Sequence, residues 1–273
     1  MKTKVFNFSM LISIVILAIL NIFKLLSGDG TIWGFSEYTS NSIVFFTALV
    51  GITIVLISSR FINFKDSELV FGKNSYSIIF SAASIIVAIA IACNSTARLI
   101  DYICTYRNII QLVLAIFGFL STATFIMITL RTLKNNDIFK NKEFLTLFPV
   151  FWSIIRLYER YTVYSATSNY PWEMADEILV ILSMVFILYQ SKIFANIASK
   201  NRFKNMIAFG YSYIIFYFTF FNAFTKPTSY IEFSNNLIDS ALFIFITFFI
   251  IINKNSLLHK VTPSNDTPDV PEA

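Results

Sequence analysis

The sequence predicts an all-α fold: an integral membrane helical bundle with about eight transmembrane helices and with both termini in the cytoplasm. Three observations predict it. The apolar residue types make up 56% of the 273 residues, and charged residues only 14%, against about 25% charged residues in soluble domains. The apolar residues form long blocks rather than one stripe per helix. The lysines and arginines gather between alternate blocks, as the positive-inside rule describes for cytoplasmic loops.

Eight apolar blocks are candidate spans, because a helix needs about 20 mostly apolar residues to cross the hydrocarbon layer. They lie near 5–26, 42–58, 76–93, 109–130, 145–164, 177–194, 206–223 and 237–253. We therefore expect one transmembrane domain over residues 1–260. The remaining segment, 261–273, holds three prolines and three acids with little to bury, which predicts a disordered cytoplasmic tail.

The first block has two interpretations. Lys2 and Lys4 before an apolar run are typical of a secretory signal. No small-x-small cleavage motif follows, and the run continues through Leu26, which favours a retained signal anchor. Cleavage stays open as the alternative; it would leave seven spans and place the N-terminus outside.

The basic residues give the orientation. With the N-terminus inside, fifteen of the 21 lysines and arginines fall in inner segments, and four fall outside: Lys24, Arg98, Arg107 and Lys226. The other two lie within the fifth block. This bias explains the net charge of +5 without a nucleic-acid partner, and membrane lipid is the partner that we expect. Omitting the fifth block would put the clusters around residues 140 and 200 on opposite sides, so the bias also favours eight spans.

The fifth block, 145–164, carries charge at mid-depth. Trp152, Arg156, Glu159 and Arg160 recur at helical spacing and share one face, and Arg156 and Glu159 are spaced to pair at i, i+3. An arginine at the bilayer centre costs roughly 2.5–3.5 kcal/mol on insertion scales, so it normally faces protein or water. Pro149 is expected to free a carbonyl one turn earlier.

Two interpretations of this face stay open. One is a polar ligand-binding site in the outer half of the membrane, with an anionic ligand held by Arg156 and Arg160. The other is a salt-bridge network that fixes helix packing. Asp176 and Glu177 begin the sixth block and Asp239 the eighth; they either join the site or stabilise helix N-termini.

Small residues in the third block form a second pattern. Ser84, Ala88 and Ala92 make a small-xxx-small row, which predicts a close packing face inside the bundle, with a homodimer contact as the alternative. Arg98 and Asp101 follow this block, and we expect them to form a solvated pair in an outer segment.

No catalytic, metal or cofactor site is expected. The chain has one histidine, His259, beyond the last block, and two cysteines, which are expected to be free thiols. It contains no GxxxxGK[ST], HExxH, GxSxG, GxGxxG or TVGYG motif.

One stretch carries a resemblance. FPVFWSIIRLYERYTVYSATSNYPWEMADEILVILSMVFILYQSKIFAN, about a fifth of the chain, is similar to a segment of uncharacterised multi-pass membrane proteins from Gram-positive anaerobic bacteria. It shares a Pro-x-x-Trp helix with an arginine, an outer loop and an acid-led helix. The resemblance implies a bacterial cell membrane and no particular activity.

These observations favour a non-catalytic ligand-binding, sensing or accessory component of the membrane. Two alternatives remain. One is a small-solute transporter that uses the same polar site. The other is an intramembrane enzyme acting on lipid, with Glu159 or Asp239 as a base.

Overall fold

The computed structural model describes residues 2–26, 32, 35–60, 76–104, 108–134, 139, 142–164, 175–194, 202–220 and 229–258. Within these residues the chain is all-helical, with eight α-helices, one short 3-10 helix and no strand. The elements are α1 (Lys2–Leu26), α2 (Glu37–Arg60), α3 (Tyr76–Cys104), α4 (Ile109–Lys134), η1 (Glu143–Leu147), α5 (Phe148–Tyr164), α6 (Ala175–Phe194), α7 (Arg202–Phe220) and α8 (Tyr230–Leu258).

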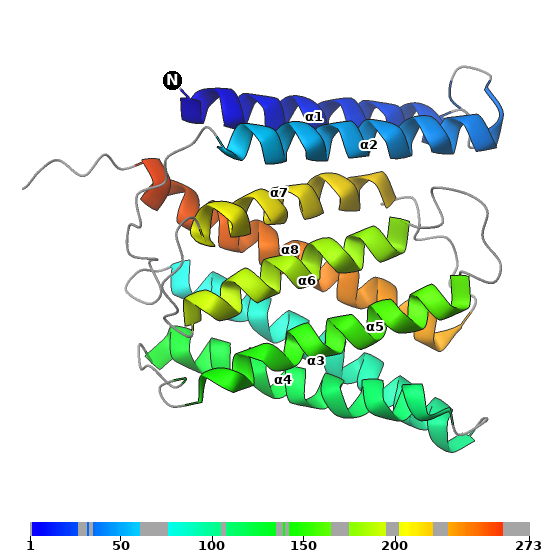
Figure 1. Cartoon of the computed structure of the whole chain (residues 1–273), viewed down its shortest axis with the longest axis vertical. Helices are drawn as coiled ribbons and strands as arrows, with labels where there is room; N and C mark the ends of the chain where they lie inside the picture. Colours follow the sequence, from blue (N-terminus) through cyan, green and yellow to red (C-terminus); the bar gives the residue numbers. More distant parts are fainter. Residues whose placement is uncertain are drawn as a thin grey trace, which may run out of the picture.

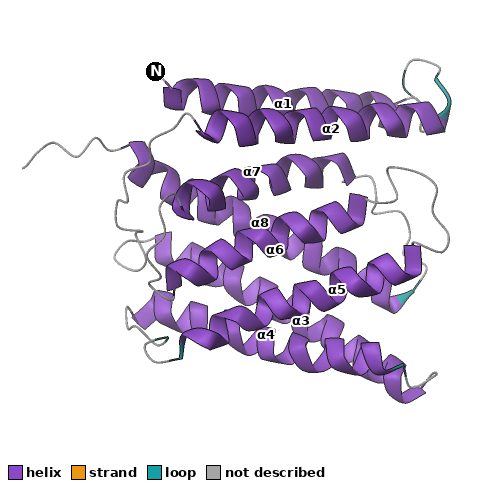
Figure 2. Ribbon diagram, in the orientation of Figure 1, coloured by secondary structure: helices purple, strands orange, loops and turns teal. Residues whose placement is uncertain are grey.

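The helices alternate in direction. Figure 1 shows each α-helix running opposite to the one before it, so that α1 begins and α8 ends at the same end of the bundle, on the left of the view. We call this the terminal end, and the opposite one the distal end. α3, α5 and α7 finish at the distal end, and α4, α6 and α8 begin there. Residues near these helix ends therefore meet in the distal half. Figure 2 shows the same elements by type, with helices and short loops in the described part of the chain.

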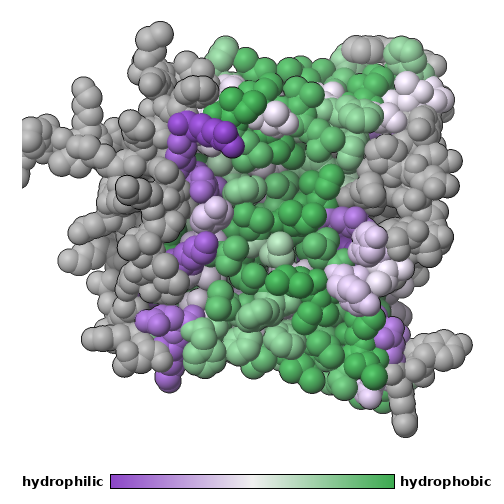
Figure 3. All heavy atoms as spheres, viewed as in Figure 1, coloured by the Kyte–Doolittle hydropathy of each residue, from purple (hydrophilic) through white to green (hydrophobic). Residues whose placement is uncertain are grey.

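The surface of the bundle is apolar where the helices cross it. Ile54, Ile89, Ile126 and Ile251 lie on four different helices and are each 43% to 56% exposed. On the face drawn in Figure 3, hydrophobic residues form a continuous band, with hydrophilic residues gathered at the two edges where the helices end. Soluble monomers rarely expose an apolar surface of this extent, whereas a lipid-facing surface requires it.

Length and composition agree with that surface. Among the described residues, five helical stretches are long and apolar enough to cross a membrane: Thr39–Arg60, Ile78–Cys104, Ile109–Leu133, Ala175–Phe194 and Tyr230–Ile252. α1 carries a shorter apolar stretch, Phe8–Phe23. The all-α prediction is confirmed for the described part of the chain, and these five helices are compatible with a helical membrane bundle. The predicted tail, 261–273, lies outside the described residues.

Each expected block coincides with a helix, and two helices extend well beyond the expected block at the distal end. α3 was expected to end near residue 93 and continues to Cys104. α8 was expected to begin near residue 237 and begins at Tyr230. In both places hydropathy falls because polar residues appear, while the helix continues. These added turns carry residues of the site described below.

The predicted small-residue row is a packing face within the chain. Ser84 and Ala88 are buried and Ala92 is half-buried on α3. The Ser84 hydroxyl donates to the carbonyl of Phe125 on α4 at 3.0 Å. Such a bond requires the two helix backbones to approach closely, which small residues permit. A homodimer contact through the same row stays a prediction.

Gly118 of α4 lies in this interface too. A Cβ atom built there would stand 2.0 Å from the Ser95 hydroxyl oxygen and 3.2 Å from Ser95 Cβ. An alanine at this position would therefore require the Ser95 side chain to move or α3 and α4 to separate slightly. The two cysteines, Cys93 and Cys104, are free and exposed along α3.

Pro149 changes the helical turn before it, as expected. The residues before it form the 3-10 helix η1 rather than another α-helical turn. Because proline has no N–H, the carbonyl of Leu145 lacks its normal α-helical donor and accepts from the Phe148 N–H. The Thr124 hydroxyl of α4 also donates to it, at 2.9 Å. The neighbouring carbonyl of Thr146 accepts from the Ser191 hydroxyl of α6 at 2.6 Å, so η1 is held between α4 and α6.

Five buried phenylalanines fill the bundle toward the terminal end, and we call them the phenylalanine cluster. They come from α3, α4, α6 and α8: Phe80, Phe125, Phe186, Phe245 and Phe249. Their ring centroids are 5.0 to 5.7 Å apart in the four contacts that join them. Each ring is at most 4% exposed, so this part of the interior is packed hydrocarbon.

Candidate functional site: a buried ionic network in the distal half

Polar and charged side chains from six helices meet inside the distal half of the bundle. They lie near the ends of α3, α5 and α7 and near the beginnings of α4, α6 and α8, as the alternation of the helices requires. We call them together the ionic network: Asn94, Arg98, Gln111, Arg156, Glu159, Arg160, Asp176, Tyr213, Asn235 and Asp239. It consists of two groups that meet at Asn235.

The first group surrounds Arg98 of α3, whose side chain is fully buried. Its Nη1 atom lies 2.6 Å from Glu159 Oε1 on α5 and 2.7 Å from Gln111 Oε1 on α4. Its Nε atom donates to Asn94 Oδ1 at 2.8 Å, and its Nη2 to Asn235 Oδ1 at 3.3 Å. Gln111 Nε2 also donates to Glu159, at 2.7 Å. Arg98 thus links α3, α4, α5 and α8.

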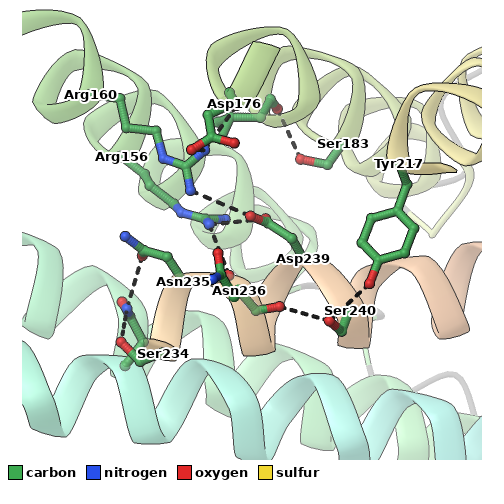
Figure 4. A network of polar contacts seen from close by, with 12 residues as sticks. Arg156, Arg160, Asp176, Ser183, Tyr217, Ser234, Asn235, Asn236, Asp239 and Ser240 are labelled. Carbon is green, nitrogen blue, oxygen red and sulfur yellow. Dashed lines mark hydrogen bonds and ion pairs between the residues drawn. The ribbon is translucent and has the colours of Figure 1, made fainter. Parts of the chain in front are cut away.

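The second group surrounds Asp239 of α8 (Figure 4). Arg156 Nη2 donates to Asp239 Oδ1 at 2.9 Å and to the carbonyl of Asn235 at 3.3 Å. Arg160 Nη2 reaches the other carboxylate oxygen, Oδ2, at 3.4 Å. Arg160 Nη1 donates to the carbonyl of Asp176 at 2.9 Å and lies 3.6 Å from its carboxylate. The Asp239 carboxylate is thus shared by the guanidinium groups of Arg156 and Arg160. The Asp176 carboxylate lies beside Arg160.

Aromatic side chains border the second group. The Tyr213 hydroxyl of α7 donates to the carbonyl of Asp239 at 2.9 Å. The Arg156 guanidinium lies 5.5 Å from the centre of the Trp152 ring, a cation–π arrangement. Two buried donors of α5, Arg156 Nε and Trp152 Nε1, have no hydrogen-bond partner in the described part of the chain. Unpaired buried donors are costly and therefore uncommon.

The structure brings together most of the residues that the sequence singled out. Arg156, Arg160, Asp176 and Asp239 form one group, and the Trp152 ring packs beside the Arg156 guanidinium. The second acid at the start of α6 is different: Glu177 is half-buried, and no ion pair joins it to another described residue.

The expected pair between Arg156 and Glu159 does not form. Glu159 pairs with Arg98 on α3, and Arg156 with Asp239 on α8. Both acids thereby bond arginines of other helices, so the charges hold the bundle together rather than one helix. An ion pair within one helix contributes only about 0.2–0.5 kcal/mol. This is too little to outweigh a buried ion pair with a residue of another helix.

The expectation that Arg98 forms a solvated pair with Asp101 is wrong, because Arg98 is fully buried within α3. A signal was present: the buried positions Ser84, Ile91, Asn94 and Arg98 follow one helical face without interruption. The polar residues after Cys93 were mistaken for the start of a loop. With Arg98 inside the bundle, three basic residues rather than four remain in predicted outer positions, and the charge bias becomes stronger.

The carboxylates of Glu159 and Asp239 both accept hydrogen bonds from arginines of other helices. Among the described residues, no group of three or more His, Cys, Asp or Glu side chains has a metal-binding arrangement.

Comparisons with other proteins add no functional information. No protein-family model, no curated protein and no solved structure matches the chain.

Proposed function

We propose that this chain is a non-catalytic component of a bacterial cytoplasmic membrane that binds a ligand at the ionic network and acts as a sensing or accessory subunit. The observation that carries the proposal is the placement of three arginines inside an apolar bundle, each at most 6% exposed. Charged residues inside a membrane are costly and mostly serve function.

The side chains of the second group become more exposed toward the distal end. Side-chain exposure rises outward from 1% for Arg156 through 6% for Arg160 and 10% for Asp239 to 41% for Asp176. In the opposite direction, toward the terminal end, the phenylalanine cluster fills the interior. This geometry favours a site reached from the distal side and closed on the other, as a receptor-like component needs.

The same geometry supports binding more than catalysis. A general base must reach the substrate proton with a carboxylate oxygen. Here two arginines hold the Asp239 carboxylate, and an arginine and an amide hold that of Glu159. In the lipid-directed enzyme that the sequence left open, one of these contacts would have to break before Glu159 or Asp239 met a substrate.

The topology of the proposal has eight spans and both termini in the cytoplasm. The alternation of the helices and the shared end of α1 and α8 support it (Figure 1). The bias of basic residues and the resemblance to bacterial multi-pass proteins point the same way. The distal end, and with it the network, then faces the outside of the cell.

A thermal-stability screen tests the function. Purified protein in detergent is heated with a panel of sugars, amino acids, amines and organic anions, and a true ligand raises the Tm because it binds only the folded state. The same ligand should not raise the Tm of Arg160→Met, while Thr96→Ala, on the lipid-facing side of α3, should respond like wild type. If the two variants respond alike to every ligand, the ionic network is not the site.

Cysteine labelling tests the topology. In a Cys93→Ala, Cys104→Ala background, single cysteines at positions 30, 105, 169 and 230 should react with a membrane-impermeant maleimide in intact cells. Single cysteines at positions 70, 137, 200 and 262 should react only after lysis. Labelling of 137 and 200 from opposite sides would exclude the eight-span arrangement.

A further inference from the structure

The contacts within the second group of the network differ greatly in strength. The Arg156–Asp239 pair is short, at 2.9 Å, and both side chains are at most 10% exposed. The Arg160–Asp176 pair measures 3.6 Å, and the Asp176 side chain is 41% exposed. The Asp176 carboxylate is therefore the acid of the network that water reaches most easily and that the arginines hold least firmly. It occupies a position where a carboxylate can be exchanged.

The buried guanidinium beside the Asp176 carboxylate is suited to bind an anion. Arg160 is 6% exposed and has its Nη1 directed toward the carboxylate and carbonyl of Asp176 (Figure 4). One turn deeper lies Arg156, with its Nε atom buried and without a hydrogen-bond partner among the described residues. Arg156 thus has fewer acceptors than its N–H groups are able to bind.

Resting on the proposed function, we infer that the site binds the carboxylate of a soluble organic anion, which takes the place of Asp176 beside Arg160. The group already at this position is a carboxylate, and planar guanidinium groups bind carboxylates in a bidentate manner. Charge decides against a phosphate. The described network pairs three arginines with Glu159, Asp239 and Asp176, so exchange of one carboxylate for another keeps the charge unchanged, whereas a phosphate dianion adds a negative charge in a poorly hydrated place.

Benzoate serves as the probe, and benzamide, a neutral molecule of the same shape, is the matched control. The chain has three tryptophans, so Trp33→Phe, Trp172→Phe leaves Trp152 as the only one. Its ring lies 5.5 Å from the Arg156 guanidinium, and its emission reports on an anion bound nearby. Titration of this variant with benzoate, benzamide, acetate and inorganic phosphate gives an apparent Kd for each compound.

Three substitutions in that background test the assignment. Asp176→Asn removes the competing carboxylate and keeps the shape, and we expect it to lower the Kd for benzoate about tenfold. Glu177→Gln, the matched control one residue away, should leave the Kd unchanged. Arg160→Met should abolish the response. If Arg160→Met does not fold, the comparison of Asp176→Asn with Glu177→Gln still decides the matter.

The outcomes separate this inference from the proposed function. Equal binding of benzamide and benzoate, or tighter binding of phosphate than of benzoate, overturns the carboxylate assignment. A weaker or unchanged benzoate Kd in Asp176→Asn overturns the exchange with Asp176. In each of these cases a ligand from the thermal screen that still depends on Arg160 leaves the proposed function standing. Failure of every compound in both experiments overturns both.

Discussion

The Arg98–Glu159 pair allows a quantitative test of how the network stabilises the bundle. In Arg98→Met, the carboxylate of Glu159, with a side chain only 13% exposed, keeps Gln111 as its partner but loses the guanidinium at 2.6 Å. Breaking one side of a buried ion pair costs about 3–5 kcal/mol, because an unpaired charge stays behind. We expect Arg98→Met to lower the free energy of unfolding by about that amount. An ordinary interhelical hydrogen bond in a membrane contributes only about 0.6 kcal/mol.

A double substitution distinguishes the cost of an unpaired buried charge from the loss of an ordinary hydrogen bond. In Glu159→Met, Arg98 remains buried with neutral partners only, so a loss of about 3–5 kcal/mol is expected again. In Arg98→Met, Glu159→Met no unpaired charge remains, and replacing a whole buried pair by apolar residues is often nearly neutral. The double variant should therefore be more stable than either single variant, with a coupling energy of about 3 kcal/mol or more.

Reversible unfolding of the purified protein in mixed micelles, followed by circular dichroism, measures these free energies. Thr96→Ala is the control on the same helix, because its side chain is exposed on the lipid side and its hydroxyl bonds only to its own helix at Ala92. A change within about 0.5 kcal/mol is expected there. If the losses of the two single variants simply add in the double variant, the reasoning about unpaired charge is refuted.

Three further predictions concern packing. Gly118→Ala places a Cβ 2.0 Å from the Ser95 hydroxyl oxygen, and we expect a loss of about 1–3 kcal/mol in the same unfolding assay, partly recovered in Gly118→Ala, Ser95→Ala; no recovery would contradict the contact. Thr124→Val removes the hydroxyl bond to the Leu145 carbonyl, which keeps the Phe148 N–H as a donor, and should cost about 0.5–1.5 kcal/mol. Thr53→Val, whose hydroxyl bonds within its own exposed helical turn, should cost less than half as much. Asn21→Leu removes the 2.7 Å hydrogen bond from α1 to the carbonyl of Phe218 on α7, and we expect proteases to cleave α1 faster than in wild type. Unchanged proteolysis would show that this bond does not hold α1 in the bundle.

The helical fold could be predicted from the sequence because a bilayer imposes a simple requirement. Each crossing needs a long apolar segment, and apolar segments are visible in the residue order alone. The errors arose where this requirement no longer applies. Inside the bundle a helix continues through Asn94 and Arg98 because their polar groups bond to residues of other helices. Hydropathy records the polarity of these residues and nothing about their partners.

The site was predicted in part for the same reason. Arg156 and Arg160 were found because two arginines at mid-depth are conspicuous, and Asp239 was found as an acid near the start of a span. Their partners across helices were not found, because pairing depends on which helices are neighbours. α8 packs against α3, and its Asp239 is reached by the long arginine side chains of α5. Nothing in the order of the blocks determines this arrangement.

The difference in strength between the two arginine–aspartate pairs suggests how ligand binding is communicated. A partly exposed pair such as Arg160–Asp176 contributes about 0–1 kcal/mol, so an incoming carboxylate needs little free energy to replace Asp176. Breaking the buried Arg156–Asp239 pair would cost several kcal/mol, so that pair stays closed. In the carboxylate exchange inferred above, α5 and α8 would remain joined, and the first turn of α6 would keep only the bond from Arg160 to the Asp176 carbonyl. If the proposed sensing role is correct, a partner protein should therefore contact the distal end of α6, where the ligand weakens a contact between helices.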